Sequence, residues 1–505
     1  MRRLPRAVIR SPVKTDIPNP VVDDISPDRS QLLVGACAAY ARDCPLWILP
    51  VLGRSPRQLG SIVAGGAAWS QDGKEIAYTQ GSSLYRVRAD GSESRKIVTV
   101  AAGGTPFWPR WSPDRSHLRF SVQTQNNGTS LWEVSADGRN LHSLLSGWNN
   151  PPADCCGSWT PDGKYFLFQS QRDGTANIWA MREEGSLFRK VNHGPVQLTT
   201  GPTSSYYPLP STGGKKVFVV AAQARGELVR YDSASRQFTP YLSGISAMGV
   251  NFSRDGKWVA YVAYPEGTLW RSKVDGSERL QLTYPPLLAI QPRWSPDGSR
   301  IVFESAQPDK PFTVYTISAD GGSPERPIPG DRDTCDPNWS PDGESLLFGR
   351  FPANEPPGVG PMDLEIVDLR THAVSKVPGS EDLWSPRWSR DGRHVLAFTR
   401  TGDRLMVFDV KAQKWAEVAK ISVAYPEWSR AGDYIHFLGA PKAGQPGGVF
   451  RVRISDHKLE QVVDMKDFRQ APGWGSWGGL APDDSPLLVR DTGTQDIYAL
   501  DWEAP

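Results

Sequence analysis

The chain has 505 residues, with 57 Lys and Arg against 55 Asp and Glu and a formal net charge of +2. This length exceeds one ordinary domain, and the balanced charge gives no case for nucleic acid or an anionic membrane as a partner. No run of about 18 apolar residues occurs, so no membrane span is predicted.

The first residues are basic but are not followed by an apolar stretch. Residues 1–6 read MRRLPR, which lacks the hydrophobic segment of a secretory signal. Taken alone, this start predicts a cytoplasmic protein if the chain is complete. Residues 7–10 (AVIR) look like the closing strand of a missing upstream repeat, so we expect the chain to be a fragment of a larger protein.

One short phrase recurs along the sequence at a nearly fixed interval. It reads Trp-Ser-Pro-Asp-Gly at residues 294–298 and again at residues 339–343. In chain order, its Ser or the equivalent residue stands at Ser26, Ser70, Ser112, Thr160, Ser211, Ser253, Ser295, Ser340, Ser389, Ser429 and Ala481. These eleven units are 40 to 52 residues apart. Such a period, filled with short alternating strands, is typical of β-propellers.

Each phrase predicts a tight corner between two strands. Pro presets φ near about −65°, Asp bonds nearby backbone N–H groups, and Gly accepts a positive φ. Around the phrase at residues 294–298, strands are expected at 291–294, 300–304 and 313–318, with a fourth near 325–328. Four antiparallel strands per repeat form one blade, so we predict an all-β fold of tandem propellers with about eleven four-stranded blades and almost no helix.

The chain contains 19 Trp, and many of them open the recurring phrase. A large ring at this position is expected to wedge between adjacent blades, because aromatic side chains bury much area in sheet cores. The Trp residues therefore need no ligand to explain them.

Eleven blades are too many for one ring, because propellers typically close with about 4–8. The weakest repeat lies around Ser211, so we place the boundary near residue 200. Residues 1–200 then form an N-terminal propeller of about four blades, and residues 201–505 form a seven-bladed one. The last repeat lacks a fourth strand, which residues 195–199 are expected to supply.

Five cysteines are present: Cys37, Cys44, Cys155, Cys156 and Cys335. Cys37 and Cys44 can face each other across a hairpin and form a disulfide in an oxidising compartment. The favoured interpretation is nevertheless five thiols. Adjacent Cys155 and Cys156 without a nearby His do not have the spacing of a zinc site.

The repeat, followed by an Ile-Ala-Phe-like strand and an Ile-Trp or Val-Tyr strand, resembles the TolB-type (WD40-like) propeller repeat over residues 20–505. Residues 147–152 (GWNNPP), 264–271 (YPEGTLWR) and 495–503 (QDIYALDWE) are similar to the C-terminal propeller region of acidobacterial winged-helix transcriptional regulators. This resemblance implies a sensor region on the periplasmic side of a membrane-anchored regulator. This chain contains neither the winged helix nor the membrane span of those regulators, so the resemblance does not imply that it binds DNA.

An active site was sought in three forms. No Gly-x-Ser-x-Gly elbow of an α/β-hydrolase occurs. The Ser and Asp of each corner are expected to cap the turn rather than to catalyse. The seven His, namely His117, His142, His193, His372, His394, His436 and His457, fall at peripheral positions of the repeats, so neither a metal centre nor a cofactor is expected.

Three first strands carry Pro-Arg-Trp, which places Arg110, Arg293 and Arg387 at equivalent positions. If these strands line a channel, Arg293 and Arg387 belong to one ring and Arg110 to the other. Arg offers a planar donor fork that suits carboxylates, so the arginines are candidates for binding an acidic peptide or ligand. The alternative is that each is tied to the corner Asp of a neighbouring blade.

The sequence therefore predicts a non-enzymatic binding or sensor module that presents its propeller rim to a protein or small-molecule ligand. A propeller enzyme of the lyase or hydrolase type that uses the central channel is the alternative. The fold is specified far more sharply than the function.

Overall fold

The computed structural model of this protein describes residues 2–3, 15–17, 20–36, 43–52, 55–100, 104–124, 128–150, 152–172, 174–183, 194–201, 203–305, 307, 311–330, 333–350, 362–441, 447–473 and 476–504. Within these residues it contains 43 β-strands and one 3-10 helix, η1 (Leu242–Gly244). The strands form eleven sheets, ten of four strands and one of three. The predicted all-β fold of about eleven blades is confirmed. No helix in the described part of the chain is long and apolar enough to cross a membrane.

The chain divides into two compact units. Unit 1 consists of Met1–Gln223 and Thr494–Pro505, and unit 2 of Ala224–Gly493. The sheets of unit 1 in the described residues, each in hydrogen-bonded order, are β2 (Pro20–Ile25), β3 (Gln31–Ala36), β4 (Cys44–Pro50) and β5 (Arg57–Ala64); β6 (Gly66–Trp69), β7 (Glu75–Gln80), β8 (Ser83–Arg88) and β9 (Arg95–Thr99); β10 (Thr105–Trp111), β11 (His117–Gln123), β12 (Thr129–Ser135) and β13 (His142–Ser143); β14 (Asp154–Trp159), β15 (Tyr165–Ser170), β16 (Asn177–Arg182) and β17 (Val196–Gln197); and β18 (Ser204–Pro210), β19 (Lys216–Gln223), β43 (Thr494–Asp501) and β1 (Arg2–Arg3).

Unit 2 contains six sheets within the described ranges. In hydrogen-bonded order they are β22 (Ala247–Phe252), β23 (Trp258–Ala263), β24 (Leu269–Lys273) and β25 (Leu280–Gln281); β26 (Ala289–Trp294), β27 (Arg300–Ser305) and β28 (Thr313–Ser318); β29 (Thr334–Trp339), β30 (Ser345–Arg350), β31 (Asp363–Asp368) and β32 (Val374–Lys376); β33 (Leu383–Trp388), β34 (His394–Thr399), β35 (Arg404–Asp409) and β36 (Lys414–Lys420); β37 (Ala424–Trp428), β38 (Tyr434–Gly439), β39 (Gly448–Arg453) and β40 (Leu459–Asp464); and β41 (Gly478–Leu480), β42 (Pro486–Asp491), β20 (Gly226–Asp232) and β21 (Gln237–Pro240). The fourth strand expected near residues 325–328 is reduced to one bridge between Thr316 and Glu325.

The corner of each repeat is built by its own side chains. At the corner between β26 and β27, Ser295 Oγ donates to Asp297 Oδ1 (2.5 Å) and accepts from the backbone N of Arg300 (2.9 Å). Gly298 has a φ of 74°, a left-handed conformation that a Cβ would disfavour. The hydrogen bond from Ser295, followed by those from Ser299, lowers the pKa of Asp297. The corner residues are thus structural, as the sequence predicts.

The Trp that opens the phrase joins neighbouring blades. Trp339 Nε1 donates to the carbonyl O of Arg293 on the preceding blade (3.0 Å), and Trp428 Nε1 donates to that of Arg387 (3.0 Å). Trp294 makes the same bond to Asn251 (3.1 Å). Trp294 and Trp339 are buried, so the predicted wedge between blades is confirmed.

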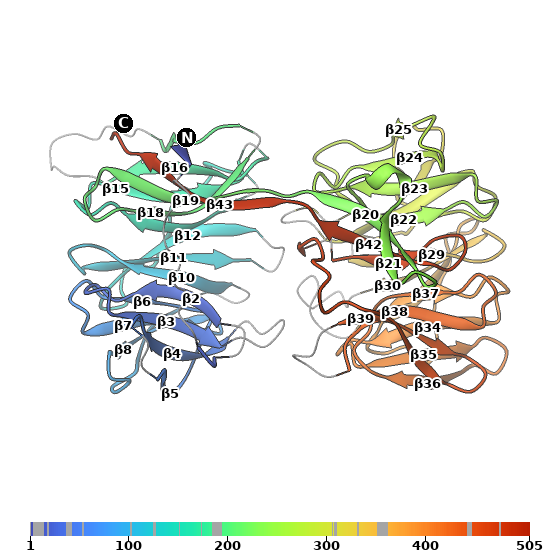
Figure 1. Cartoon of the computed structure of the whole chain (residues 1–505), viewed down its shortest axis with the longest axis horizontal. Helices are drawn as coiled ribbons and strands as arrows, with labels where there is room; N and C mark the ends of the chain where they lie inside the picture. The colour runs from blue at the N-terminus through green and yellow to red at the C-terminus, as the bar shows by residue number, and fades with distance from the viewer. Residues whose placement is uncertain are drawn as a thin grey trace. The chain divides into compact units, whose positions relative to one another are not determined.

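One sheet in each unit is assembled from distant parts of the chain (Figure 1). In unit 1, β43 pairs antiparallel with β19, with Lys216 opposite Asp501 and Gln223 opposite Thr494. In unit 2, β20 pairs with β42, with Gly226 opposite Asp491. The repeat that begins with β18 and the repeat that begins with β41 have therefore exchanged their outer strands.

This exchange moves the division of the chain away from residue 200. The predicted split assigned four repeats to residues 1–200 and seven to residues 201–505, whereas the described sheets fall five to unit 1 and six to unit 2. The fifth repeat keeps its first two strands in unit 1 and supplies its next two to unit 2. Within residues 195–199, β17 pairs with β16 of its own blade and does not complete the last repeat.

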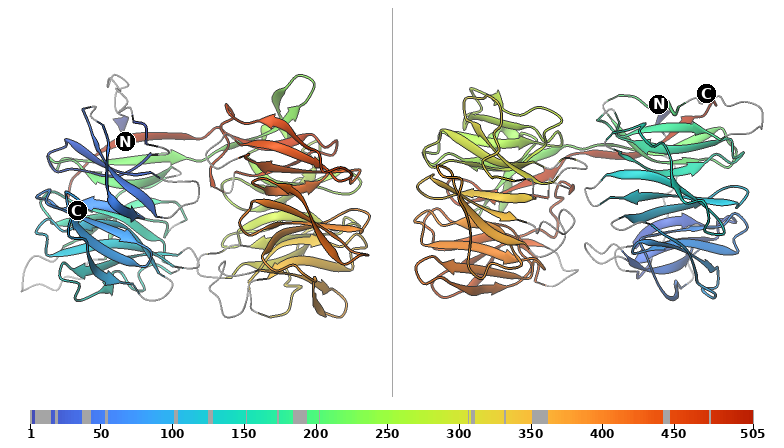
Figure 2. Two further views of the ribbon diagram at one scale, coloured as in Figure 1. Left: turned by 90° about the horizontal axis from the view of Figure 1, so that it is seen from below. Right: turned by 180° about the vertical axis from the view of Figure 1, so that it is seen from behind.

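The first strands of the six blades of unit 2 form a closed circuit. β22, β26, β29, β33, β37 and β41 each contact the next, and β41 contacts β22. The green start and the red end of this unit lie side by side in Figure 2, where β20 pairs with β42. In unit 1, β2, β6, β10, β14 and β18 contact in the same sequential order, and Arg29 of the first blade donates to Thr212 of the fifth (2.8 Å). Closure of this kind leaves few unpaired sheet edges.

The cysteines differ in part from the favoured prediction of five thiols. Cys155 and Cys156 are joined in a disulfide between adjacent residues, at a position where Cys156 has a left-handed φ of 60°. Cys335 is a buried thiol, and burial raises its pKa well above the usual range. The predicted pairing of Cys37 with Cys44 involves a residue, Cys37, outside the described part of the chain.

Candidate functional site

Four consecutive first strands of unit 2 carry a β-bulge. The bulged residues have left-handed backbones and are Gln291 (φ 48°), Asp336 (φ 50°), Ser385 (φ 54°) and Tyr425 (φ 50°). Bulges re-aim side chains and are enriched next to functional sites. Here they bring Gln291 and Asp336 to Arg387 on β33.

Arg387 is almost completely buried, with 2% of its surface exposed. Its Nη2 donates to Gln291 Oε1 (2.5 Å) and lies 3.7 Å from Asp336 Oδ1. Its Nε lies 3.7 Å from Glu427 Oε1, and its Nη1 donates to the carbonyl O of Pro386 (2.8 Å). Both sides of the guanidinium are therefore engaged by protein groups.

Arg293 on β26 shares Glu427 with Arg387. Its Nη2 forms an ion pair with Glu427 Oε1, and 11% of its side chain is exposed. Its Nε is buried and has no hydrogen-bond partner among the described residues. Burial lowers the pKa of Arg293, while the charge of Glu427 acts in the opposite direction. Glu427 thus bridges the two arginines.

Another acid, Glu304 on β27, is buried near these residues. We call Arg293, Arg387, Asp336, Glu427 and Glu304 together the charged layer. Its Oε2 accepts a hydrogen bond from the backbone N of Asp336 (2.8 Å), and 6% of the residue is exposed. Burial, and after it the negative charge of Asp336, raise the pKa of Glu304 to about 8. A carboxyl with this pKa is largely protonated at neutral pH.

The raised pKa of Glu304 makes the stability of unit 2 depend on pH. The folded protein holds this proton up to about pH 8, whereas an unfolded Glu releases it near its model value of 4.5. Unfolding between these values releases a proton, so Glu304 makes stability fall as pH rises through this window, by at most about 1.4 kcal/mol per pH unit. Replacing the carboxyl by an amide in Glu304→Gln should flatten that decline.

Urea unfolding at pH 5, 6, 7 and 8 measures this effect as the difference between Glu304→Gln and the parent protein. The difference isolates Glu304, since the other titrating groups are common to both proteins. Parallel pH profiles would contradict a raised pKa at this position.

Arg110 lies in unit 1, apart from the other two candidates. Its Nη2 donates to the carbonyl O of Asp23 (3.2 Å), and its Cζ lies 4.5 Å from the centroid of the Trp108 ring. Trp108 in turn stacks on Tyr207, with centroids 5.2 Å apart. Burial raises the pKa of Asp23 to about 7, against the lowering effect of Arg110. Arg110 is therefore held by a carbonyl and an aromatic ring.

The structure favours structural partners for the three predicted arginines, but not the partners that were expected. Arg293 and Arg387 pair with acids of the first strands, Glu427 and Asp336, rather than with a corner Asp. Corner carboxylates such as that of Asp297 accept a hydrogen bond from the Ser of their own turn. The sequence identified the charged layer but not its pairing.

Three further arginines were not singled out from the sequence. Arg254, Arg390 and Arg430 occupy the second corner position, where Pro296 and Pro341 stand in two other blades of unit 2. All three are exposed. All three line the same hollow. Burial, followed by the positive charges of Arg430 and Arg254, lowers the pKa of Arg390. The replacement of Pro by Arg in the repeat was the signal that could have revealed them.

The corners of all six blades of unit 2 border two adjoining hollows that are open to solvent. Their shared lining residues are Asn251, Phe252, Arg254, Arg293, Arg390 and Glu427. Arg430 and Asp484 line the first hollow, and Pro341 lines the second. We call this region the corner mouth of unit 2.

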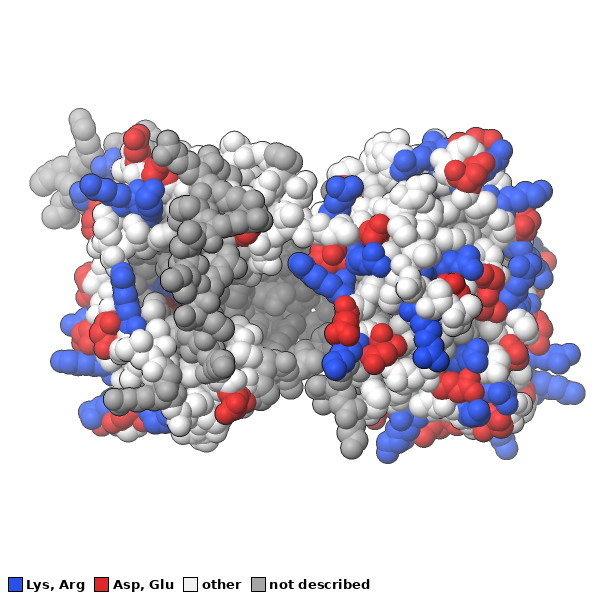
Figure 3. All heavy atoms as spheres, in the orientation of Figure 1, with Lys and Arg blue, Asp and Glu red and all other residues white. Residues whose placement is uncertain are grey.

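Charge on the face of unit 2 drawn in Figure 3 is mixed. On the face shown in Figure 3, Lys and Arg are interspersed with Asp and Glu over this unit. Interspersed charges largely cancel beyond a Debye length of about 8–10 Å. The clustering of Arg254, Arg390 and Arg430 is therefore a local feature of the corner mouth.

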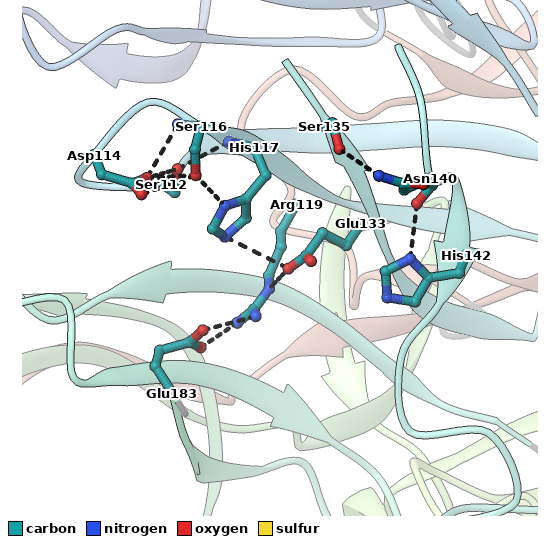
Figure 4. Close-up of polar contacts among 10 residues, drawn as sticks. All are labelled: Ser112, Asp114, Ser116, His117, Arg119, Glu133, Ser135, Asn140, His142 and Glu183. Carbon is teal, nitrogen blue, oxygen red and sulfur yellow. Dashed lines mark hydrogen bonds and ion pairs between the residues drawn. The ribbon is translucent and has the colours of Figure 1, made fainter. Parts of the chain in front are cut away.

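One corner of unit 1 superficially resembles a catalytic triad (Figure 4). Ser116 Oγ lies 2.8 Å from His117 Nδ1, and His117 Nε2 lies 3.5 Å from Glu133 Oε2. The Ser116 hydroxyl, however, donates to both oxygens of Asp114 (2.8 Å each), so its proton is directed away from the imidazole. Glu133 is also engaged by Arg119 Nε (2.7 Å). This geometry caps a corner and does not activate a nucleophile.

Arg119 explains the rest of this cluster. Its other nitrogens reach Glu183 at the end of the next blade, with Nη2 2.9 Å from Oε2, and its Cζ lies 4.9 Å from the Trp159 ring. The cluster thus fastens two blades together. Across the described ranges, no group of three or more His, Cys, Asp or Glu residues is placed to hold a metal ion.

Comparison with known proteins finds TolB-type repeats in part of this chain. The family described as "TolB beta propeller domain" matches residues 60–244, so this part carries TolB-type repeats. The "Uncharacterized peptidase YuxL" of Bacillus subtilis is 30% identical over 165 residues, which are 32% of this chain and 23% of that protein. The "Uncharacterized protein Atu1656" of Agrobacterium fabrum is 25% identical over 207 residues, 36% of this chain and 67% of that protein. The chain thus spans about a quarter of the length of the first of these relatives.

Solved propeller structures show fold-level likeness. The putative TolB of Agrobacterium tumefaciens has a TM-score of 0.44 and 18% identity, and the match covers 53% of this chain and 99% of that one. The tricorn protease has a TM-score of 0.32 and 12% identity, with 95% of this chain and 61% of that one covered.

Proposed function

We propose that this chain is a non-enzymatic binding module that takes up its ligand, a protein segment or a small molecule, at the corner mouth of unit 2. The observation that carries the proposal is the pair of adjoining hollows bordered by all six corners. A rigid ring that positions six loops around one opening is a common arrangement for binding.

The charged layer beneath the mouth supports binding rather than catalysis. Arg293 and Arg387 are tied to Glu427, and Glu304 accepts a backbone hydrogen bond. Catalytic acids and bases need access to a reacting group, whereas Glu304 is buried and Glu427, which lines the hollows, is held by two arginines. Of the three arginines predicted from the sequence, Arg293 lines the mouth and Arg387 supports its floor, while Arg110 of unit 1 stays a prediction.

We further propose that the module is the sensor part of a transcriptional regulator. The support is the resemblance of residues 147–152, 264–271 and 495–503 to acidobacterial regulators. An in-frame winged helix and membrane span upstream of residue 1 in the genomic reading frame would support this role, and a stop codon directly upstream would contradict it.

A steric block tests the binding site. The full chain is screened by thermal shift against small molecules and short peptides, because a ligand that binds only the folded state raises its melting temperature. Pro341→Trp should abolish the shifts, since it places a large ring in the mouth. The corner should tolerate the change, because three other corners carry Arg at this position. Binding should fall at least about tenfold, which corresponds to about 1.4 kcal/mol.

Pro113→Trp is the matched control, because it makes the same substitution at a corner of unit 1. It should leave the shifts unchanged. Ligands that still bind Pro341→Trp with full affinity would place the site elsewhere and contradict the proposal.

A further inference from the structure

The corner mouth carries more positive charge than its own acids neutralise. Arg254, Arg293, Arg390 and Arg430 line the first hollow, together with only two acids, Glu427 and Asp484. Glu427 is already shared by Arg293 and Arg387. Asp484 accepts a hydrogen bond from the backbone N of Arg430 (2.8 Å), so its carboxylate is partly used by the main chain.

The guanidinium groups at the corner mouth have few hydrogen-bond partners among the described residues. No hydrogen bond or ion pair joins the guanidinium of Arg254 or Arg390 to any residue in the described ranges. Arg430 makes only a long contact from Nη1 to the carbonyl O of Pro482 (3.4 Å). By contrast, Arg393, three residues after Arg390 in the same corner, has an acidic partner, because its Nε lies 3.5 Å from Asp391 Oδ2.

A fourth arginine, Arg293, belongs to the lining of the same hollows. Its Nε is buried without a hydrogen-bond partner among the described residues. An unpaired buried donor is costly, and like charges held close together repel one another. A bound anion reduces both costs. It accepts hydrogen bonds from the donors, and its negative charge offsets the repulsion between the cations.

We infer that the corner mouth of unit 2 binds the compact oxyanion of a small molecule, a phosphate or a dicarboxylate, through Arg254, Arg390 and Arg430. This inference rests on the proposed function and adds the chemical class of the ligand. Planar guanidinium forks bind such oxygens in pairs, with short charge-assisted hydrogen bonds. The hollows leave room for the remainder of a small molecule beside the anionic group.

Calorimetry of the full chain with two probes tests the inference. Inorganic phosphate and malonate are titrated separately at constant ionic strength, and the two arms distinguish a phosphate source from a carboxylate source. Saturable 1:1 binding of either probe is expected. The triple variant Arg254→Gln/Arg390→Gln/Arg430→Gln should weaken it by at least about tenfold, because hydrogen bonds to charged groups are among the stronger ones. Raising the salt concentration should weaken binding in the parent protein.

Arg393→Gln is the matched control, since it removes the same charge from the same corner and should leave the affinity unchanged. All four side chains are exposed, and unchanged melting temperatures would show that the variants fold. In Arg390→Lys, which keeps the charge but loses the fork, binding should weaken less than in the triple variant.

Absence of binding by both probes, or equal affinity in the triple variant, would overturn the inference. The proposed function is judged separately, because Pro341→Trp blocks neutral and charged ligands alike. A neutral ligand that is lost in Pro341→Trp but retained in the triple variant would keep the binding module and reject the oxyanion.

Discussion

Deleting residues 494–505 is expected to unfold unit 1 and to leave unit 2 folded. The deletion removes β43, the third strand of the composite blade, which pairs with β19 along its whole length. It also removes Tyr498, Leu500 and Trp502, which pack against the buried cluster around Tyr165 and Val217. Loss of a central strand with three core side chains should cost more than about 5 kcal/mol, because each large-to-small change in a core alone costs several.

Unit 2 should remain folded, because its ring of six blades is complete without these residues. β20 and β21 close it on β42 and β41, and all four strands lie within Ala224–Gly493. Urea unfolding followed by Trp fluorescence, together with limited proteolysis, should show one transition in the truncated protein and cleavage confined to unit 1. Deletion of residues 503–505 alone is the control, since it keeps β43 and Trp502. Protection of unit 1 in the longer deletion would contradict the strand exchange.

The local features of this fold could be predicted because they depend on neighbouring residues. A corner needs only its own Ser, Pro, Asp and Gly, and the wedge position of a Trp follows from its place in the phrase. β28 coincides with the predicted strand at residues 313–318 for the same reason. Short-range patterns of this kind determine the blade and its repeat.

The exchange of outer strands could not be predicted from the same patterns. β20 (GELVRYD) and β43 (TQDIYALD) both read as third strands of a blade. Such a pattern identifies a strand but does not name its partner, since any third strand fits any second strand to a first approximation. The sequence indicates that the last repeat lacks an outer strand, but it holds no signal that β20 and β21, rather than residues 195–199, complete this sheet.

The candidate site shows the same limit. Equivalent positions in the repeat correctly grouped Arg293 with Arg387, and Glu427 occupies the matching position of the next blade. Their pairing depends on the bulges at Gln291 and Asp336, which turn these side chains towards Arg387. The corner arginines do not form part of the repeat pattern, because they stand at a position where other blades carry Pro.

Replacing Arg387 by Met is expected to destabilise unit 2 by about 3–5 kcal/mol, because removing one partner of a buried ion pair leaves the other charge uncompensated. Arg387 lies within 4 Å of Asp336 and Glu427, and its positive charge also favours ionisation of Glu304. The loss should be larger near pH 8, where part of Glu304 is ionised, than at pH 5, where Glu304 holds its proton.

The measurement is urea unfolding of unit 2 at both pH values, with the exposed Arg393→Met as control, which should change stability by less than about 0.5 kcal/mol. Adding Glu304→Gln to Arg387→Met should recover part of the loss, since it removes one of the acids that Arg387 faces. A pH-independent loss below about 1 kcal/mol would show that Arg387 is not needed to hold the charged layer together. Arg387 would then return to the set of residues available to a ligand, and the floor of the corner mouth would extend down to β33.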